Sequence, residues 1–442
     1  MKRTTLLRGT VFAGLAIFAA GATLAQQPAA PKAAAPKGAA PKAAAAASAR
    51  PAPVAASHML MGVNCDAPPA YHCPDEMCDG SIVTQEGNTV EMKTRRTFFL
   101  DCPKGYKPGD KVNVMLLLHG FGSYANWTRM YFPAVDVKDK YHLVLITPGS
   151  ITRSWSEADD AYLQNAVDAV VATVGKKNVD HFILAGHSQG GATSARLVCT
   201  PYFRDKVDVR ISLSGGRVGP VTPGKNGGFT AGSAGTPVYR QDPKAGPAPA
   251  RAATAGPFGA GAGPGRGPAP AGTAAAPPPG GDCDYSFIFS NGENETIPGD
   301  TSPLADKFGC GKRVREADVI DPKKGYVWDS TQQDPGSDGW GHYPRSGRAQ
   351  VFNFPNCKGG RVVADVVKLG KGHTEGYEPN ITDKIMAMAV SAKGGKIRNG
   401  SWDPPAPEAQ ATFGLPPAAP AARGPAPARA GAAPARAGTT TR

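Results

Sequence analysis

The sequence carries almost no net charge once its low-complexity segments are set aside. The 442 residues have a formal net charge of +13, and the excess of basic residues lies in residues 1–25, 26–58, 217–282 and 403–442. The rest of the chain therefore lacks the basic excess that a phosphate-binding face requires. We expect no nucleic-acid partner, and at most a weak tether of the basic tails to an anionic envelope surface.

The sequence also lacks a long hydrophobic run near its N-terminus. The apolar segment Val11–Ala20 is too short to span a bilayer comfortably. Three basic residues precede it, a small-residue pattern ending at Ala25 follows it, and no cysteine comes close behind that could carry a lipid. This order predicts a signal peptide over residues 1–25, with an uncleaved anchor as the alternative. We expect a secreted or periplasmic protein with no transmembrane segment after cleavage.

Three segments lack the apolar side chains that a packed core needs. The chain has 55 glycines and 43 prolines, and they concentrate with alanine in these segments. We predict a disordered Ala-Pro-Lys linker at 26–58, a disordered insertion at about 220–281 and a disordered tail at 403–442. The insertion fits a tolerated surface loop better than a mobile lid. Residues 59–402, without the insertion, fit one single-core domain of about 280 residues.

The cysteine spacing matches no common zinc pattern, although His72 lies beside Cys73 and close to Cys78. Eight cysteines in an exported protein fit disulfide bridges better than redox chemistry. We therefore expect structural disulfides, whose pairing the sequence leaves open. We expect neither a metal ion nor a cofactor.

Short apolar runs bounded by turn residues recur through the chain. Such runs are typical of strands buried on both faces of a mostly parallel sheet. Between them, apolar residues on one face predict a helix over Glu157–Lys176. The alternation predicts an α/β fold, with a mostly parallel central sheet flanked by helices. The predicted strands are Val112–Leu118, Leu143–Thr147, Phe182–Ala185, Val209–Leu213, Tyr285–Phe289 and Val362–Leu369.

The sharpest motif is Gly-His-Ser-Gln-Gly at residues 186–190, between a predicted strand and a predicted helix. A serine on a tight strand-to-helix turn needs small neighbours, and the turn lifts its hydroxyl above the sheet. This context predicts that Ser188 is the nucleophile of an α/β-hydrolase elbow. A glycine-rich turn with an idle serine is the alternative.

A serine nucleophile needs a base, and in this fold the chain order is nucleophile, acid, histidine. Only His342 and His373 follow Ser188. We favour His373 as the base because it comes directly after the last predicted strand and before a predicted helix at Thr382–Ser391. His342 has no strand leading into it, so we assign it to the rim or to substrate contact.

The acid should follow the preceding strand. Glu293 and Glu295 lie in the turn after Tyr285–Phe289. The fold commonly places this carboxylate three residues after a glycine, and counting from Gly292 selects Glu295, with Glu293 as the alternative. Its expected role is to orient the imidazole and stabilise the imidazolium.

Donors for an oxyanion are predicted at two amides. A buried strand ends in His119-Gly120-Phe121-Gly122, where the glycines let the backbone bend toward the nucleophile. Phe121 and Gln189 would each give one N–H. His119 is expected to be a structural turn residue.

With these motifs in place, the chain resembles the secreted feruloyl esterase and polyhydroxybutyrate depolymerase-like branch of the α/β-hydrolases. The resemblance runs from about Arg95 to Ser391 and is carried by TRRTFFLDCPKGY, LLLHGFGS, ADDAYLQNAVDAVV, AGHSQGGATSARLVC and NCKGGRVVADVVKLGKGHT. Two positions depart from that group. It usually has Asp at the acid position, and its elbow often reads Leu-Ser-Ala, whereas this chain has Glu295 and His-Ser-Gln.

The resemblance implies a serine carboxylic-ester hydrolase, and the residues named above predict a Ser-His-Glu triad for it. Its implied substrates are feruloyl or acetyl esters of polysaccharide, or short polyesters. A secreted serine peptidase and a non-catalytic, envelope-tethered binding protein remain the alternatives. Four aromatic residues could form platforms for sugar or aryl groups, although ordinary packing explains them equally well: Trp155, Trp340, Tyr343 and Trp402.

Overall fold

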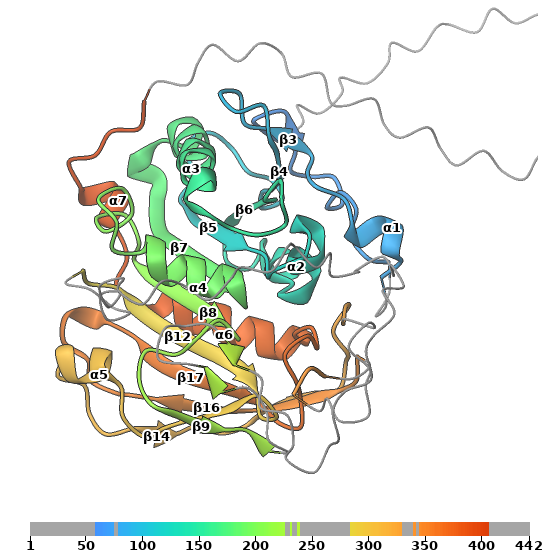
Figure 1. Cartoon of the computed structure of the whole chain (residues 1–442). Coiled ribbons are helices and arrows are strands. Elements are labelled where there is room, and N and C mark those ends of the chain that lie inside the picture. The colour runs from blue at the N-terminus through green and yellow to red at the C-terminus, as the bar shows by residue number, and fades with distance from the viewer. Residues whose placement is uncertain are drawn as a thin grey trace, which may run out of the picture. The chain divides into compact units, whose positions relative to one another are not determined.

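The computed structural model describes most of the predicted domain (Figure 1). The predicted signal peptide, the linker up to residue 57, most of the insertion and the tail from residue 406 lie outside the described residues. The described residues are 58–74, 78–225, 230–231, 237–238, 283–328, 339–341 and 344–405.

Eleven strands of the described chain form one sheet. Their order is β14-β16-β17-β12-β8-β7-β5-β6-β4-β3, and β15 also pairs with β16. The six central strands, from β17 to β6, are all parallel. The strands are β3 (Thr89–Val90), β4 (Thr97–Asp101), β5 (Val112–Leu118), β6 (Leu143–Pro148), β7 (Val179–His187), β8 (Val209–Leu213), β12 (Ser286–Gly292), β14 (Val314–Arg315), β15 (Val319–Asp321), β16 (Gly347–Asn353) and β17 (Val363–Lys368).

The six predicted apolar runs form these six parallel strands, because side chains on both faces are buried. Along β5, Val114, Leu116 and Leu118 join one hydrophobic cluster, whereas Met115 and Leu117 join the other. Successive side chains of a strand point to opposite faces, so a continuous apolar run supplies two cores at once. The predicted fold class is confirmed: this is an α/β-hydrolase fold with a mostly parallel central sheet.

Helices cover both faces of the sheet (Figure 1). Apolar residues of α3 (Asp160–Val174), α4 (Gln189–Leu197) and α7 (Lys396–Asn399) belong to the first cluster. Those of α2 (Ala125–Tyr131) and α6 (Pro379–Ser391) belong to the second. No helix in the described ranges is long and apolar enough to cross a membrane. The remaining short elements are α1 (Gly80–Val83), α5 (Pro303–Lys307), η1 (Ala134–Val137), η2 (Glu157–Asp159), η3 (Lys176–Asn178), η6 (Lys358–Gly360), β1 (Met59–Leu60), β2 (Val63–Asn64), β9 (Val221–Pro223), β10 (Thr230–Ala231), β11 (Pro237–Val238) and β13 (Thr296–Pro298).

Antiparallel strands extend the sheet at both edges. β4 pairs antiparallel with β6 and with β3, and β16 pairs antiparallel with β17. The apolar pattern of the sequence does not predict β16, because only two of its seven residues are buried. A half-exposed strand contains no continuous apolar run.

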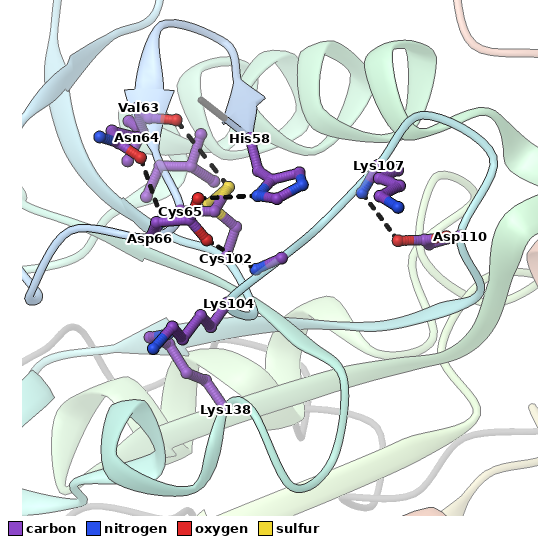
Figure 2. The surroundings of a disulfide bond; sticks show 12 residues. His58, Val63, Asn64, Cys65, Asp66, Cys102, Lys104, Lys107, Asp110 and Lys138 are labelled. Atoms are coloured by element: carbon purple, nitrogen blue, oxygen red, sulfur yellow. Dashed lines mark hydrogen bonds and ion pairs between the residues drawn. A yellow bond between two sulfur atoms is a disulfide. The ribbon is translucent and has the colours of Figure 1, made fainter. Parts of the chain in front are cut away.

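All eight cysteines are paired in four disulfides: Cys65–Cys102, Cys73–Cys78, Cys199–Cys283 and Cys310–Cys357. The first joins the segment after the β1–β2 hairpin to the end of β4 (Figure 2). Beside it, the Asp66 carboxylate contacts the His58 imidazole at 2.7 Å and accepts a hydrogen bond from the Gly105 amide at 2.9 Å. The third disulfide joins the chain on either side of the insertion.

A buried ion pair ties α2 to β4. Arg129 donates two hydrogen bonds to the Asp101 carboxylate, from Nε at 2.7 Å and from Nη2 at 2.5 Å. The Arg129 side chain is fully buried, and Nη1 also donates to the Ala70 carbonyl and to Asn126. Removing one partner of such a pair leaves an uncompensated charge in the interior.

We expect Asp101→Ala to lower the free energy of unfolding by about 3–5 kcal/mol, because Arg129 would remain buried without its counter-charge. The matched control is Glu316→Ala. It removes the Lys384–Glu316 pair, whose side chains are about one-third exposed, and should cost less than about 1 kcal/mol. Urea denaturation with the disulfides intact measures both changes. Equal losses in the two variants would contradict the assigned role of the buried pair.

Candidate active site

Ser188 occupies a strained turn between β7 and α4. Its backbone has φ 52° and ψ −118°, a conformation that side chains other than glycine rarely adopt. The amide of Ser188 donates to the carbonyl of Leu213 in β8 at 2.9 Å. This hydrogen bond joins the turn to the neighbouring strand β8. Ser188 therefore lies at the edge of the sheet where the parallel strands have their carboxyl ends.

The glycines around Ser188 are required by close backbone contacts. A Cβ on Gly186 would lie 2.3 Å from the Gly190 backbone, and one on Gly190 would lie 2.3 Å from the Leu118 carbonyl oxygen. A Cβ on Gly191 would lie 2.6 Å from the Cα of Gly215. No side chain fits at these three positions, which explains the small residues of the motif.

Three residues far apart in the sequence form one hydrogen-bonded chain. The Ser188 hydroxyl lies 2.8 Å from His373 Nε2, and His373 Nδ1 lies 2.7 Å from Glu295 Oε2. Ser188 follows β7, Glu295 follows β12 and His373 follows β17. Carboxyl ends of parallel strands share one edge of the sheet, and this fold uses that edge for its ligands.

The Glu295 carboxylate is nearly completely buried and fully hydrogen-bonded. Its Oε1 accepts from the Gly292 amide at 2.7 Å and from the Ser214 hydroxyl at 2.8 Å. An ionised carboxylate only accepts, so these donors and the imidazole satisfy it. The His373 proton therefore lies on Nδ1, and Nε2 is the nitrogen that can accept the Ser188 hydroxyl proton.

The two carboxylates of the turn point to different partners. Glu293 Oε2 accepts from the Gly370 amide at 2.9 Å, and Glu293 Oε1 pairs with Lys225 at 2.6 Å. The structure thus places Glu295, and not Glu293, against the imidazole of His373. His342 lies outside the described residues.

The backbone carbonyl of His373 accepts two hydrogen bonds that no sequence motif predicts. Tyr131 of α2 donates its hydroxyl proton at 2.9 Å, and His187 donates from Nε2 at 3.1 Å. The rings of Tyr131 and His187 also pack against each other, tilted by 40° with centroids 4.0 Å apart. Burial holds the pKa of His187 well below its usual value, so His187 remains a neutral donor. These contacts fix the loop that carries the imidazole.

Phe121 and Gln189, the predicted oxyanion donors, border Ser188. A Cβ on Gly120 would lie 3.3 Å from the Cβ of Ser188, so the loop of Phe121 touches the elbow. Gln189 is the first residue of α4. Within the described residues, neither the Phe121 amide nor the Gln189 amide donates a hydrogen bond to a protein acceptor. The first amides of a helix have no partner inside it, which leaves the Gln189 amide available to a ligand oxygen.

His119 orients the peptide that carries the Phe121 amide. His119 Nε2 accepts from the Ser150 amide at 3.0 Å, so its proton lies on Nδ1, which donates to the Gly120 carbonyl at 2.7 Å. That carbonyl belongs to the same planar peptide as the Phe121 amide. Burial lowers the pKa of His119 to about 4, which keeps the ring neutral. His119 is a structural residue of the turn, as its position in the motif indicates.

The four aromatic residues proposed as platforms have different surroundings. Trp155 is buried, with 6% of its surface exposed, and packs against His119. Trp402 lies against Tyr202, and Trp340 meets the edge of the His373 ring with centroids 5.2 Å apart. Tyr343 lies outside the described residues. Of the three described residues, Trp340 is in contact with the hydrogen-bonded chain of Ser188, His373 and Glu295. No group of three or more His, Cys, Asp or Glu side chains in the described ranges could hold a metal ion.

Comparison with known proteins gives partial matches. No protein-family profile matches the sequence. A putative esterase/lipase 2 of Mycoplasma genitalium is 34% identical over 91 residues, which cover 20% of this chain and 33% of that protein. The chain thus spans a third of the length of this curated relative.

Solved structures of two hydrolases also match. Esterase 2 of Thermogutta terrifontis in its apo form has a TM-score of 0.24 and 15% identity over 31% of this chain and 58% of that chain. The S-formylglutathione hydrolase of Staphylococcus aureus has a TM-score of 0.24 and 19% identity over 29% of this chain and 55% of that chain. The chain spans a little over half of each structure.

The depressed pKa of His119 predicts a loss of stability in mild acid. An unfolded histidine takes up a proton near pH 6.5, whereas folded His119 does so only near pH 4. The unfolded state therefore gains protons as the pH falls through this window, and the contribution of His119 to stability, present above pH 6.5, is lost. From pH 7 to pH 5 this amounts to about 2 kcal/mol.

His119→Asn provides the comparison, because its amide can still donate to the Gly120 carbonyl but does not titrate. Between pH 7 and pH 5, we expect the free energy of unfolding to fall by about 2 kcal/mol less in the variant than in the wild type. Urea denaturation at both pH values measures it. The same pH dependence in both proteins would show that His119 titrates normally.

Proposed function

We propose that the protein is a serine carboxylic-ester hydrolase that works through an acyl-enzyme. The observation that carries this proposal is the continuous chain from the Ser188 hydroxyl through His373 to Glu295, next to two amides that donate to no acceptor among the described residues. Nucleophile, base and orienting acid within hydrogen-bonding distance are the arrangement that activates a serine. In this proposal, each of the three residues has one role.

The proposed reaction has two steps. The Ser188 oxygen attacks the ester carbonyl carbon while His373 Nε2 takes the hydroxyl proton, and the carbonyl electron pair moves onto its oxygen. The amides of Phe121 and Gln189 stabilise this oxyanion. Collapse of the intermediate expels the alcohol, which receives the proton from His373. Water then repeats the sequence on the acyl-enzyme, releases the acid and restores Ser188.

Glu295 supports the positive imidazolium that forms in both steps. Its contact with Nδ1 is buried, where an ionic hydrogen bond is stronger than in water. The acid does not need to take the proton itself. The match to a protein named esterase/lipase, although it covers a third of that relative, supports the choice of esters as substrates.

For the substrate, we propose esters with an aryl or short aliphatic part, as on feruloylated or acetylated polysaccharide or in short polyesters. Support comes from two exposed apolar side chains on the loops that adjoin the elbow: Phe121 is 63% exposed and Ile151 is 78% exposed. Their loops are joined by a hydrogen bond from the Gly122 amide to the Arg153 carbonyl at 2.7 Å. Exposed apolar groups next to a reactive serine can bind the apolar part of an ester.

We also propose that the protein works outside the cytoplasm, in the periplasm or after secretion. Four disulfides in one domain support this proposal, because such bridges persist in oxidising compartments. The predicted signal peptide is consistent with this location.

Ser188→Ala should abolish turnover of 4-nitrophenyl acetate, with a loss of at least about 10³-fold in kcat/KM, because no other group supplies the nucleophile. A fluorophosphonate probe should label the wild type and leave the variant unlabelled. Wild-type protein that neither turns over esters nor reacts with the probe would favour the non-catalytic binding protein. Labelling with turnover of peptides alone would favour the peptidase.

Glu295→Gln and Glu293→Gln separate the two carboxylates of the turn. A neutral amide in place of the Glu295 carboxylate cannot stabilise the imidazolium, so we expect kcat to fall by about 10²–10⁴-fold. Glu293→Gln removes a charge that faces Lys225 and the Gly370 amide, and should change kcat by less than about threefold. Steady-state kinetics on the same ester measures both. A larger loss for the Glu293 variant would reverse the assignment of the acid.

A further inference from the structure

One loop contacts both parts of the proposed oxyanion hole. The loop of residues 149–156 follows β6 and lies between the Phe121 turn and the start of α4. On one side, the Ser150 amide donates to His119 Nε2, and the Arg153 carbonyl accepts from the Gly122 amide at 2.7 Å. On the other, the Gln189 side-chain amide donates to the Ser154 hydroxyl at 2.9 Å.

Trp155 is the residue of this loop that reaches both sides by itself. Its indole N–H donates to the His119 carbonyl at 2.8 Å, and its ring packs on the His119 ring with centroids 4.5 Å apart. Its backbone amide donates to the Gln189 side-chain oxygen at 3.1 Å. The two proposed oxyanion amides come from different elements, the turn after β5 and the start of α4, and Trp155 is hydrogen-bonded next to each.

The loop of residues 149–156 is itself fixed by Asp159 and Arg96. The Asp159 carboxylate accepts from the Ser156 amide at 3.0 Å and forms an ion pair with Arg96 at 2.8 Å. Arg96 also donates to the Gly149 carbonyl at 2.8 Å. The side chains of Arg96 and Asp159 are 12% and 8% exposed, so water screens this pair weakly. Both ends of the loop are therefore fixed.

We propose that Trp155 is a positioning residue that sets the distance and direction between the Phe121 and Gln189 amides. This inference rests on the proposed function, because it assigns a task within that reaction. Oxyanion stabilisation depends on donors aimed where charge develops, and small errors in their position are costly. Trp155 touches neither the substrate nor the nucleophile in this mechanism, and it acts through His119 and Gln189.

Trp155→Phe tests the proposal, because it keeps an aromatic ring against His119 and removes the indole donor. We expect kcat on 4-nitrophenyl acetate to fall about tenfold, with KM changed less than about threefold. A trifluoromethyl ketone, which Ser188 converts to a tetrahedral oxyanion, should bind about tenfold more weakly.

Trp127→Phe is the matched control. Trp127 is also buried, but its indole N–H reaches no acceptor in the described part of the chain. Its ring packs against Tyr131 and His187, and a phenyl ring at this position keeps an aromatic contact with both. Both variants replace a buried indole by a phenyl ring, so a general loss of packing should affect them alike. We expect the control to keep kcat and ketone affinity within about threefold of the wild type.

Gln189→Ala is a second variant that tests the same contacts without changing a core residue. It retains the backbone amide and removes both side-chain contacts with the loop. We expect a similar fall in kcat, and the double variant Trp155→Phe/Gln189→Ala should lose less than the product of the two single losses, since both act on one arrangement.

Wild-type kcat and ketone affinity in Trp155→Phe would overturn the inference, and so would equal losses in the Trp127 control. Either result leaves the proposed function intact as long as Ser188→Ala is inactive. Full activity of Ser188→Ala would instead refute the proposed function itself.

Discussion

The site depends on the close approach of backbone to backbone at the elbow. Ser188 keeps its unusual conformation because Gly186, Gly190 and Gly191 let α4 approach within contact of the Leu118 carbonyl and of Gly215. Backbone strain of this kind persists only where the surrounding structure over-determines it. Here three neighbouring strands, β5, β7 and β8, provide that constraint, and every other group of the site is placed relative to the serine they hold.

Three histidines at this edge of the sheet have separate tasks because their surroundings differ. His373 has a carboxylate on one nitrogen and the serine on the other. In the described part of the chain no carboxylate contacts the His119 ring or the His187 ring, and burial keeps each neutral and able to donate to a backbone carbonyl. Neutral rings support the two loops without placing a second positive charge beside the imidazolium that would form at His373.

The sequence predicted the features that depend on local pattern. Continuous apolar runs marked the parallel strands, and the spacing from Gly292 selected the carboxylate that faces His373. It did not predict contacts between distant residues, such as that from Tyr131 to the His373 carbonyl or the disulfide pairing, because nothing in the local pattern of one partner specifies the other. For the same reason the sequence leaves Trp155 open between an aromatic platform and ordinary packing. In a sequence the indole counts as an apolar side chain. Only the folded structure shows that its N–H donates to the buried carbonyl of His119.

The disulfide between Cys199 and Cys283 has a consequence for the integrity of the chain. Ser188 lies before this bond, whereas Glu295 and His373 lie after it, and the insertion lies between the two cysteines. A proteolytic cut anywhere within the insertion would therefore leave two fragments that remain covalently linked. Backbone continuity through this Ala, Pro and Gly-rich stretch is not needed to keep the serine and the imidazole in one molecule.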